Sequence, residues 1–187
     1  MTVEAMLLDG YPVDTVVQVG TDRNGRDYTP LMLACNSNEI ELAQLLLSHG
    51  ADVNKQSFNG WFPLAIAGEH QNRKLIQALL EAGASVSLYS KDGSSGLSQF
   101  VEGFEERKCV SEADLQLVER LCAPEVINRV PAYGNPPLHA AAMRGLLDLC
   151  RVLLRNGALR AVKNRFGETA VGVGRFGGRE FLLDDEE

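Results

Sequence analysis

The amino-acid sequence predicts an all-α solenoid built from stacked pairs of short helices. The first evidence is a period, because the Pro-Leu pair that begins at Pro30 recurs 33 residues later at Pro63. Glycines at the corresponding place in each unit extend this period at spacings of 33, 41 and 33 residues, namely Gly60, Gly93, Gly134 and Gly167. A period of this length is typical of proteins in which each repeat packs on its neighbours.

Local residue chemistry divides each unit into two short helices and an extended loop. Proline suits the first turn of a helix, so Pro30, Pro63 and Pro137 each indicate a helix start. A glycine that follows a Leu-Leu run can adopt the left-handed conformation that ends a helix, as expected at Gly50 and Gly83. Between such marks the apolar residues follow helical spacing.

The chain resembles the ankyrin-repeat family, whose unit reads roughly Gly-x-Thr-Pro-Leu-His-x-Ala-Ala and ends in Leu-Leu and Gly-Ala-Asp-Val-Asn. Residues 50–54 read Gly-Ala-Asp-Val-Asn, and residues 137–142 read Pro-Leu-His-Ala-Ala-Ala. The resemblance covers nearly the whole chain. It implies an ankyrin-repeat solenoid with finger loops, about four full repeats and capping half-repeats at the ends.

We predict a single ankyrin-repeat domain over residues 1–187. Its parts are an N-terminal half-repeat cap with a long polar loop (1–21), four repeats (22–54, 55–87, 88–128 and 129–161), and a C-terminal cap repeat with an acidic tail (162–187). A truncated or processed N-terminus would give the same incomplete first unit, so both interpretations stay open.

The repeat at 88–128 is the irregular one, because it carries eight extra residues near 103–111. We expect longer helices on both sides of this insertion, the second from about Glu112 to Cys122. Ser111 followed by Asp114 fits a capping box at the start of that second helix.

Composition indicates a helical protein with enough apolar residues for one continuous core. The chain is 45% hydrophobic and 23% charged. It has no apolar run near the roughly 20 residues that span a bilayer, so we expect no membrane insertion. The four cysteines have no metal-type spacing and are interpreted as reduced packing residues, which favours a cytoplasmic or other reducing intracellular location. They are Cys35, Cys109, Cys122 and Cys150.

Charge is distributed unevenly along the chain. Residues 1–128 contain 9 Lys or Arg and 18 Asp or Glu, whereas residues 129–183 contain 9 and 3. A solenoid separates these halves in space, so an acidic partner segment facing the Arg-rich C-terminal half is expected. Nucleic acid is disfavoured, because the net charge is −7 and the cations form no dense stripe. We expect a monomer when the protein is on its own.

The sequence does not indicate an enzyme. Residues 172–177 match the dinucleotide-binding string Gly-x-Gly-x-x-Gly, but no strand precedes them and the chain ends before the acidic residue that would follow. The three histidines have no partners at metal or triad spacing, so no catalytic residue, cofactor or metal is predicted. The resemblance implies that His139 is a structural residue. The histidine of the family usually bonds a threonine hydroxyl, which His139 lacks because Pro136 stands at the threonine position. The resemblance also leaves hydroxylation of Asn54 as an alternative to structural capping.

Surface recognition is the function that remains. The resemblance implies a concave groove lined by finger loops and first helices, where side chains vary freely. The protein-binding candidates at these positions are Phe58, Asn59, Trp61, Glu69, His70, Lys91, Asp92, Tyr133, Asn135, Met143, Arg144, Arg165 and Phe166. Aromatic and arginine side chains dominate binding hot spots. Phe58 and Trp61 are the predicted anchors, extended by Tyr133, Arg144 and Arg165.

Phe62 stands where the family places the threonine that caps the first helix. We expect the helix to lose this cap at Phe62, and the chain to gain exposed aromatic surface at Phe62 and Trp61. The opposite interpretation is that the loop rings pack against neighbouring loops.

The sequence therefore predicts a non-enzymatic protein–protein interaction module, an adaptor or scaffold that binds another protein through its concave face. The alternative is a permanent structural subunit of a larger assembly, docked through the insertion at 103–111 and through its ends.

Overall fold

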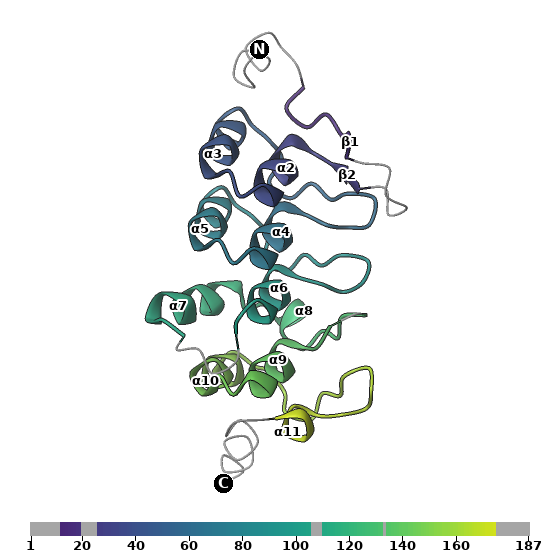
Figure 1. Ribbon diagram of the computed structural model, residues 1–187, viewed down its shortest axis with the longest axis vertical. Helices are drawn as coiled ribbons and strands as arrows, with labels where there is room; N and C mark the ends of the chain where they lie inside the picture. Colours follow the sequence, from purple (N-terminus) through teal and green to yellow (C-terminus); the bar gives the residue numbers. More distant parts are fainter. Residues whose placement is uncertain (1–11, 20–25, 106–109, 133, 175–187) are drawn as a thin grey trace.

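The computed structural model describes residues 12–19, 26–105, 110–132 and 134–174. Helix pairs are stacked in sequence order along the long axis of the molecule (Figure 1). The elements are β1 (Val17–Val19), β2 (Arg26–Tyr28), α2 (Pro30–Asn36), α3 (Ile40–Ser48), α4 (Pro63–Glu69), α5 (Arg73–Glu81), α6 (Gly96–Glu102), α7 (Glu112–Leu121), α8 (Pro124–Ile127), α9 (Pro137–Arg144), α10 (Leu147–Arg155) and α11 (Ala170–Val173). The predicted all-α solenoid is confirmed.

Each unit combines a first helix, a second helix and a loop that projects sideways. The first helices α2, α4, α6, α9 and α11 form one column, and the second helices α3, α5, α7 and α10 form another (Figure 1). The finger loops extend from the first-helix column, on the side opposite the second helices (Figure 1). This arrangement leaves the fingers and the first helices side by side on one face.

Local signals determine where the helices begin. Thr29 caps α2, since its side chain accepts a hydrogen bond from Met32 N at 3.3 Å, and Pro30 follows in the first turn. Helix α6 has no proline, and Ser95 caps it through a box with Ser98. Phe62 precedes α4 and provides no side-chain cap.

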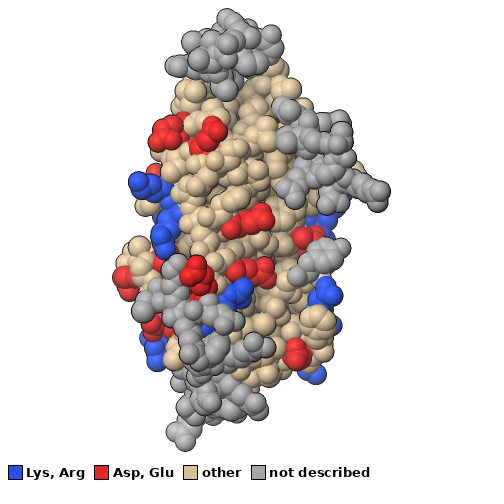
Figure 2. Space-filling model, in the orientation of Figure 1, with Lys and Arg blue, Asp and Glu red and all other residues tan. Residues whose placement is uncertain are grey.

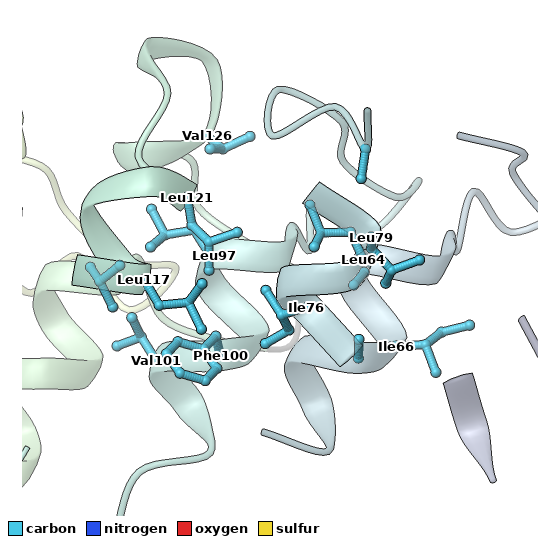
Figure 3. Packing of buried hydrophobic residues seen from close by; sticks show 14 of the residues in the cluster. Leu64, Ile66, Ile76, Leu79, Leu97, Phe100, Val101, Leu117, Leu121 and Val126 are labelled. Atoms are coloured by element: carbon cyan, nitrogen blue, oxygen red, sulfur yellow. The ribbon is translucent and has the colours of Figure 1, made fainter. Parts of the chain in front are cut away.

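One hydrophobic core runs through the stack. Figure 3 shows Ile76 of α5 and Phe100 of α6 directed toward the same interior layer, with Leu117 of α7 close by. All three side chains are buried. Such burial contributes about 25 cal/mol per Å² of apolar surface removed from water. The alanine-rich first helices let the columns approach closely, as in α9, where Ala140 and Ala141 are fully buried.

Two asparagines fasten the end loop of one repeat to the next. The Asn54 amide donates to Gly83 O at 3.2 Å and its oxygen accepts from Ser85 N at 2.7 Å. Asn128 makes the same pair of bonds further along the chain. Both polar atoms of Asn54 are therefore engaged in structural capping.

The N-terminal loop forms more regular structure than expected. Strand β1 pairs antiparallel with β2, so that Val17 lies opposite Tyr28, where the sequence suggested only a polar finger. The Asp14 carboxylate accepts from Asp52 N at 3.1 Å, which ties the preceding segment to the first repeat. Most of the predicted half-repeat cap lies outside the described residues.

The irregular repeat confirms one prediction and corrects another. Ser111 and Asp114 form the predicted capping box at the start of α7. The expectation of longer flanking helices is wrong for α6, which has 7 residues like α4, because its polar stop at Glu102 and Gly103 matches the other units. Helix α7 has 10 residues. The helical turn α8 replaces the end loop, since Pro124 stands at a helix start.

Candidate recognition surface

The fingertips are joined in a row by hydrogen bonds to backbone carbonyls. Lys91 N donates to Asn59 O at 3.1 Å, and Ala132 N donates to Asp92 O at 2.6 Å. The Arg165 guanidinium then donates to Ala132 O. We call the tip residues of these loops the fingertip ridge: Phe58, Asn59, Lys91, Asp92, Ala132, Arg165 and Phe166. Since each of these fingers is bonded to the next, their tips are held in fixed relative positions.

A close approach of two fingers depends on glycine. Gly60 has a φ of 79°, in the left-handed region. A Cβ atom at this position would lie 2.8 Å from Lys91 N, which belongs to the next finger. Glycine is thus required here both by conformation and by space.

Two exposed aromatic rings on the ridge each lie beneath a cation. The Phe58 side chain is 70% exposed, and the Lys91 ammonium lies 4.1 Å from its ring centroid. Phe166 is 71% exposed, with the Arg165 guanidinium 4.9 Å from its ring. Cations and exposed apolar area therefore occur together at both ends of the ridge.

A third pair of this kind was missed by the sequence analysis. The Arg129 guanidinium lies 3.3 Å from the centroid of the exposed Tyr89 ring, in the stem of the third finger. The two residues lie 40 positions apart, and the insertion shifts their register, so the period does not pair them.

The aromatic residues at the base of the second finger are less accessible than expected. Phe62 is only 1% exposed and belongs to the core, so the expectation of exposed area there is wrong. Its ring points inward because α4 follows at once and packs against the neighbouring helices. Trp61 is half-buried against the core, and its backbone N donates to Ser57 Oγ at 3.0 Å. Trp61 is therefore only partly accessible, whereas most of the Phe58 side chain is exposed.

The ends of the first helices form the second half of this face. Glu69 and His70, at the end of α4, are exposed, and Met143 at the end of α9 is half-exposed. Figure 2 shows acidic side chains over the middle of the face, with a basic one among them, and both basic and acidic side chains along the edge formed by the fingers. The face thus carries charges of both signs.

Arg144 was predicted to bind a partner protein, and the structure shows that it also has a structural role. Its guanidinium donates to Glu102 O at 2.9 Å and to Ala140 O at 3.1 Å. The Glu102 carbonyl is at the end of α6, where backbone acceptors lack helical partners, and the Ala140 carbonyl lies within α9. Arg144 joins two repeats, and only its half-exposed part remains for a ligand.

Glu102 is a residue of this face that the sequence analysis did not select. It lies 33 positions after Glu69, in the same column of first-helix ends. Its Oε1 accepts from Asn135 N at 3.0 Å, and Asn135 Oδ1 in turn accepts from Asn164. Burial raises the pKa of Glu102 and Asp92 adds to this, whereas the Asn135 N–H and Arg144 oppose it. Asn135, a predicted contact residue, is therefore held within this network.

Two sequence features fall partly outside the description. Tyr133 lies outside the described residues, as do 175–177 of the glycine string. The described part of that string, 172–174, overlaps the end of the short helix α11. The loop before α11 contributes an isolated bridge between Lys163 and Thr169. This loop before α11 forms the last finger.

Groups suited to chemistry are few in the part of the chain that the structure describes. Within it, no cluster of three or more His, Cys, Asp or Glu side chains is placed to hold a metal ion. His139 is buried, with Nε2 3.0 Å from Glu168 O and with Nδ1 lacking a hydrogen-bond partner among the described residues. This agrees with the missing threonine hydroxyl. No described helix is long and apolar enough to cross a membrane.

The stacked helix pairs and linked finger loops define a solenoid repeat protein in which fingers and first helices share one extended face. A family model for ankyrin repeats, in three copies, matches residues 2–90, and a model for a single ankyrin repeat matches residues 133–165. The chain belongs to the ankyrin-repeat family. Ankyrin repeats generally act as protein–protein interaction modules and are generally not enzymes.

Several curated proteins are similar to this chain. Ankyrin repeat and SAM domain-containing protein 6 of Rattus norvegicus is 37% identical over 117 residues, which is 62% of this chain and 12% of that protein. Mitochondrial disaggregase of Bos taurus is 29% identical over 84% of this chain and 22% of its own length. B-cell lymphoma 3 protein homolog of Mus musculus is 30% identical over 82% of this chain and 33% of its own length. The chain thus spans a third or less of these relatives.

Proposed function

We propose that this protein is a non-enzymatic interaction module that binds another protein through the face formed by its finger loops and first helices. The observation that carries the proposal is the fingertip ridge, which is tied together from finger to finger and nevertheless exposes large apolar side chains. Aromatic side chains held in place on a surface supply the large apolar contact area on which binding hot spots depend. Preorganisation lowers the entropic cost of binding.

Phe58 is the principal anchor in this proposal. Its ring has the larger accessible area, and the core does not require it, because 70% of the side chain is exposed. Trp61 contributes the edge that the core leaves uncovered. Glu69, His70 and Met143 border the same face and supply polar and apolar contacts around the anchors.

The partner is proposed to contribute an acidic segment. The excess of Lys and Arg over residues 129–183 supports this part of the proposal, and Arg165 places one of those cations on the ridge. We further propose a reducing intracellular location. Cys35 and Cys150 are buried free thiols, and burial raises the pKa of each to about 12, so both remain protonated packing residues.

Affinity measurements on single variants test the anchors. A partner is first identified by proximity labelling in the source cell and then purified. Phe58→Ala is expected to weaken binding by about tenfold or more, and Trp61→Ala by somewhat less, in line with hot-spot truncations. Gln77→Ala, an exposed substitution on α5, is the matched control and should bind normally. Unchanged affinity in both aromatic variants, with thermal unfolding intact, rules out this face as the binding site.

A further inference from the structure

Cations outnumber carboxylates on the fingertip ridge, which carries Lys91 and Arg165 against Asp92. The Asp92 carboxylate accepts hydrogen bonds from Ser90 Oγ and from Ser94 N, and so faces its own finger. Glu168 accepts from the Asn164 amide at 3.3 Å within the last finger. Asp92 is therefore half-buried and bonded within its own finger, whereas Glu168 stays exposed beside the ridge. Lys91 and Arg165 are the cations that the ridge presents, and both are exposed.

Each of these cations is held beside an exposed ring. Lys91 and Phe58 occupy the same place in successive units, two residues before the fingertip glycine, so stacking brings them together. The ammonium lies 4.1 Å from the ring centroid, and Arg165 lies over Phe166 at 4.9 Å. Each pair therefore presents a positive charge and an apolar surface close together, where one ligand segment can contact both.

We propose that the fingertip ridge binds a peptide segment in which carboxylates are interspersed with aromatic or large apolar side chains. The carboxylates would pair with Lys91 and Arg165, and the apolar side chains would cover Phe58 and Phe166. Arg165 has five N–H donors, of which one is used at Ala132 O, so donors remain for a carboxylate. This inference rests on the proposed function and adds the chemistry of the partner.

A peptide fits this surface better than a polyphosphate. Binding to nucleic acid draws on many cations at once, and here two cations are separated by an intervening finger whose tip residue is Ala132. The whole chain carries a net charge of −7, which repels an extended polyanion. A short segment with a few carboxylates needs only these local charges.

Selection from a library of displayed random peptides tests the proposal on the whole chain of residues 1–187. We expect the selected peptides to be enriched in Asp and Glu next to Phe, Tyr, Trp or Leu. The best of these peptides, synthesised with a fluorescent label, then serves as the probe for affinity measurements by polarisation. Replacing its carboxylates by amides, or its aromatic residues by alanine, should each abolish most of the binding.

Charge reversal on the protein supplies the second arm. Lys91→Glu and Arg165→Glu are each expected to weaken the probe by about five- to tenfold, and added salt should weaken wild-type binding. Lys74→Glu and Arg120→Glu, equal charge changes at exposed sites on α5 and α7, are the matched controls and should leave the affinity unchanged. Lys91→Gln repeats the test with a smaller perturbation of folding.

Three outcomes overturn the inference: no peptide is selected, the selected peptides are basic or uncharged, or the ridge variants bind the probe as tightly as the controls do. The proposed function fails on a different result. A partner protein that depends on Phe58 and Trp61 but tolerates Lys91→Glu and Arg165→Glu would leave the interaction module intact and refute only the acidic, aromatic segment.

Discussion

Arg73 at the start of α5 and Asp114 at the start of α7 form an ion pair with two hydrogen bonds, one from Nε and one from a terminal guanidinium nitrogen. The Asp114 side chain is 2% exposed and that of Arg73 is 54% exposed. Ser111 completes the site, because its N and Oγ both donate to Asp114 Oδ2. The pair spans the junction between the regular second repeat and the repeat that carries the insertion.

Removing the buried carboxylate should destabilise the solenoid at this junction. Asp114→Ala is expected to lower the free energy of unfolding by about 2–3 kcal/mol, since it removes charge-assisted hydrogen bonds and leaves Ser111 N without its acceptor. The loss stays below that of a fully buried pair, because Arg73 remains hydrated. Urea unfolding gives the value. Glu112→Ala, an exposed change in the same helical turn, is the control, and equal losses in the two variants would contradict a special role for Asp114.

Acid should weaken the fold through His139. Burial lowers the pKa of His139, although its bond to Glu168 O and the Glu168 carboxylate oppose the shift. The unfolded chain, with an ordinary histidine pKa near 6.5, then binds more protons than the folded chain. The stability that depends on a neutral His139 is complete above about pH 6.5. It is lost as the pH falls through the pKa of His139 in the folded chain, and the free energy of unfolding changes by at most about 1.4 kcal/mol per pH unit.

The slope can be assigned by substitution. Unfolding free energies are measured between pH 7.5 and 4.5 on wild type, His139→Gln and His70→Gln. His139→Gln should lose the part of the slope that begins near pH 6.5, whereas His70→Gln, an exposed change, should keep it. Parallel curves for wild type and His139→Gln would assign the pH dependence to other groups.

The parts of the fold that could be predicted from the sequence depend on local signals. The proline at Pro63, the capping pair Ser111 and Asp114, and the glycine at Gly83 each act within one helical turn, so their meaning does not depend on distant residues. The fixed period then supplies the stacking, because each unit has only neighbours to pack against. Fold class follows from these two facts together.

The candidate surface was harder to predict because exposure depends on how neighbouring units meet. Phe58 and Phe62 lie in one loop and have similar chemistry, yet one ring is in water and the other is in the core. Arg144 looks like a contact residue until the carbonyls of the preceding repeat are placed beside it. Glu102 lies 33 positions after Glu69 and before the insertion, so the period used to select the other positions could have found it.

The burial of Phe62 decides the outcome of restoring the family residue there. Phe62→Thr would add a helix cap worth about 1 kcal/mol, but it removes a buried ring whose truncation typically costs 3–5 kcal/mol. We therefore expect a net loss of about 2–4 kcal/mol, measurable by chemical denaturation. Phe58→Thr is the matched control at an exposed position and should change stability by about 0.5 kcal/mol or less. Stabilisation by Phe62→Thr would mean that the ring contributes little to the core.

Gly60 links stability to the geometry of the ridge. Gly60→Ala forces a side chain into the left-handed region and pushes a Cβ atom toward Lys91 N. A cost of about 1–3 kcal/mol is expected, together with faster amide exchange at Lys91, whose N–H is bonded to Asn59 O. Gly50→Ala has a similar φ but open space around the new Cβ atom, so it should carry the conformational cost alone. Equal effects of the two substitutions would show that finger contact is unimportant.

Two substitutions at Glu102 distinguish the stability that its hydrogen bond contributes from the free-energy cost of burying its charge. Its Oε1 accepts from Asn135 N, while burial raises the pKa of the carboxyl. Glu102→Gln keeps an acceptor and removes the desolvated charge, so stability at pH 7 should be unchanged or higher by up to about 1 kcal/mol. Glu102→Ala leaves Asn135 N unpaired and should cost about 1–2 kcal/mol. If the two variants are equally destabilised, attraction between Glu102 and Arg144 outweighs the cost of burying the charge.

The pH dependence gives a second test at Glu102. Because the pKa of Glu102 is raised in the folded chain, wild type should gain stability as the pH falls through that pKa, and Glu102→Gln should not.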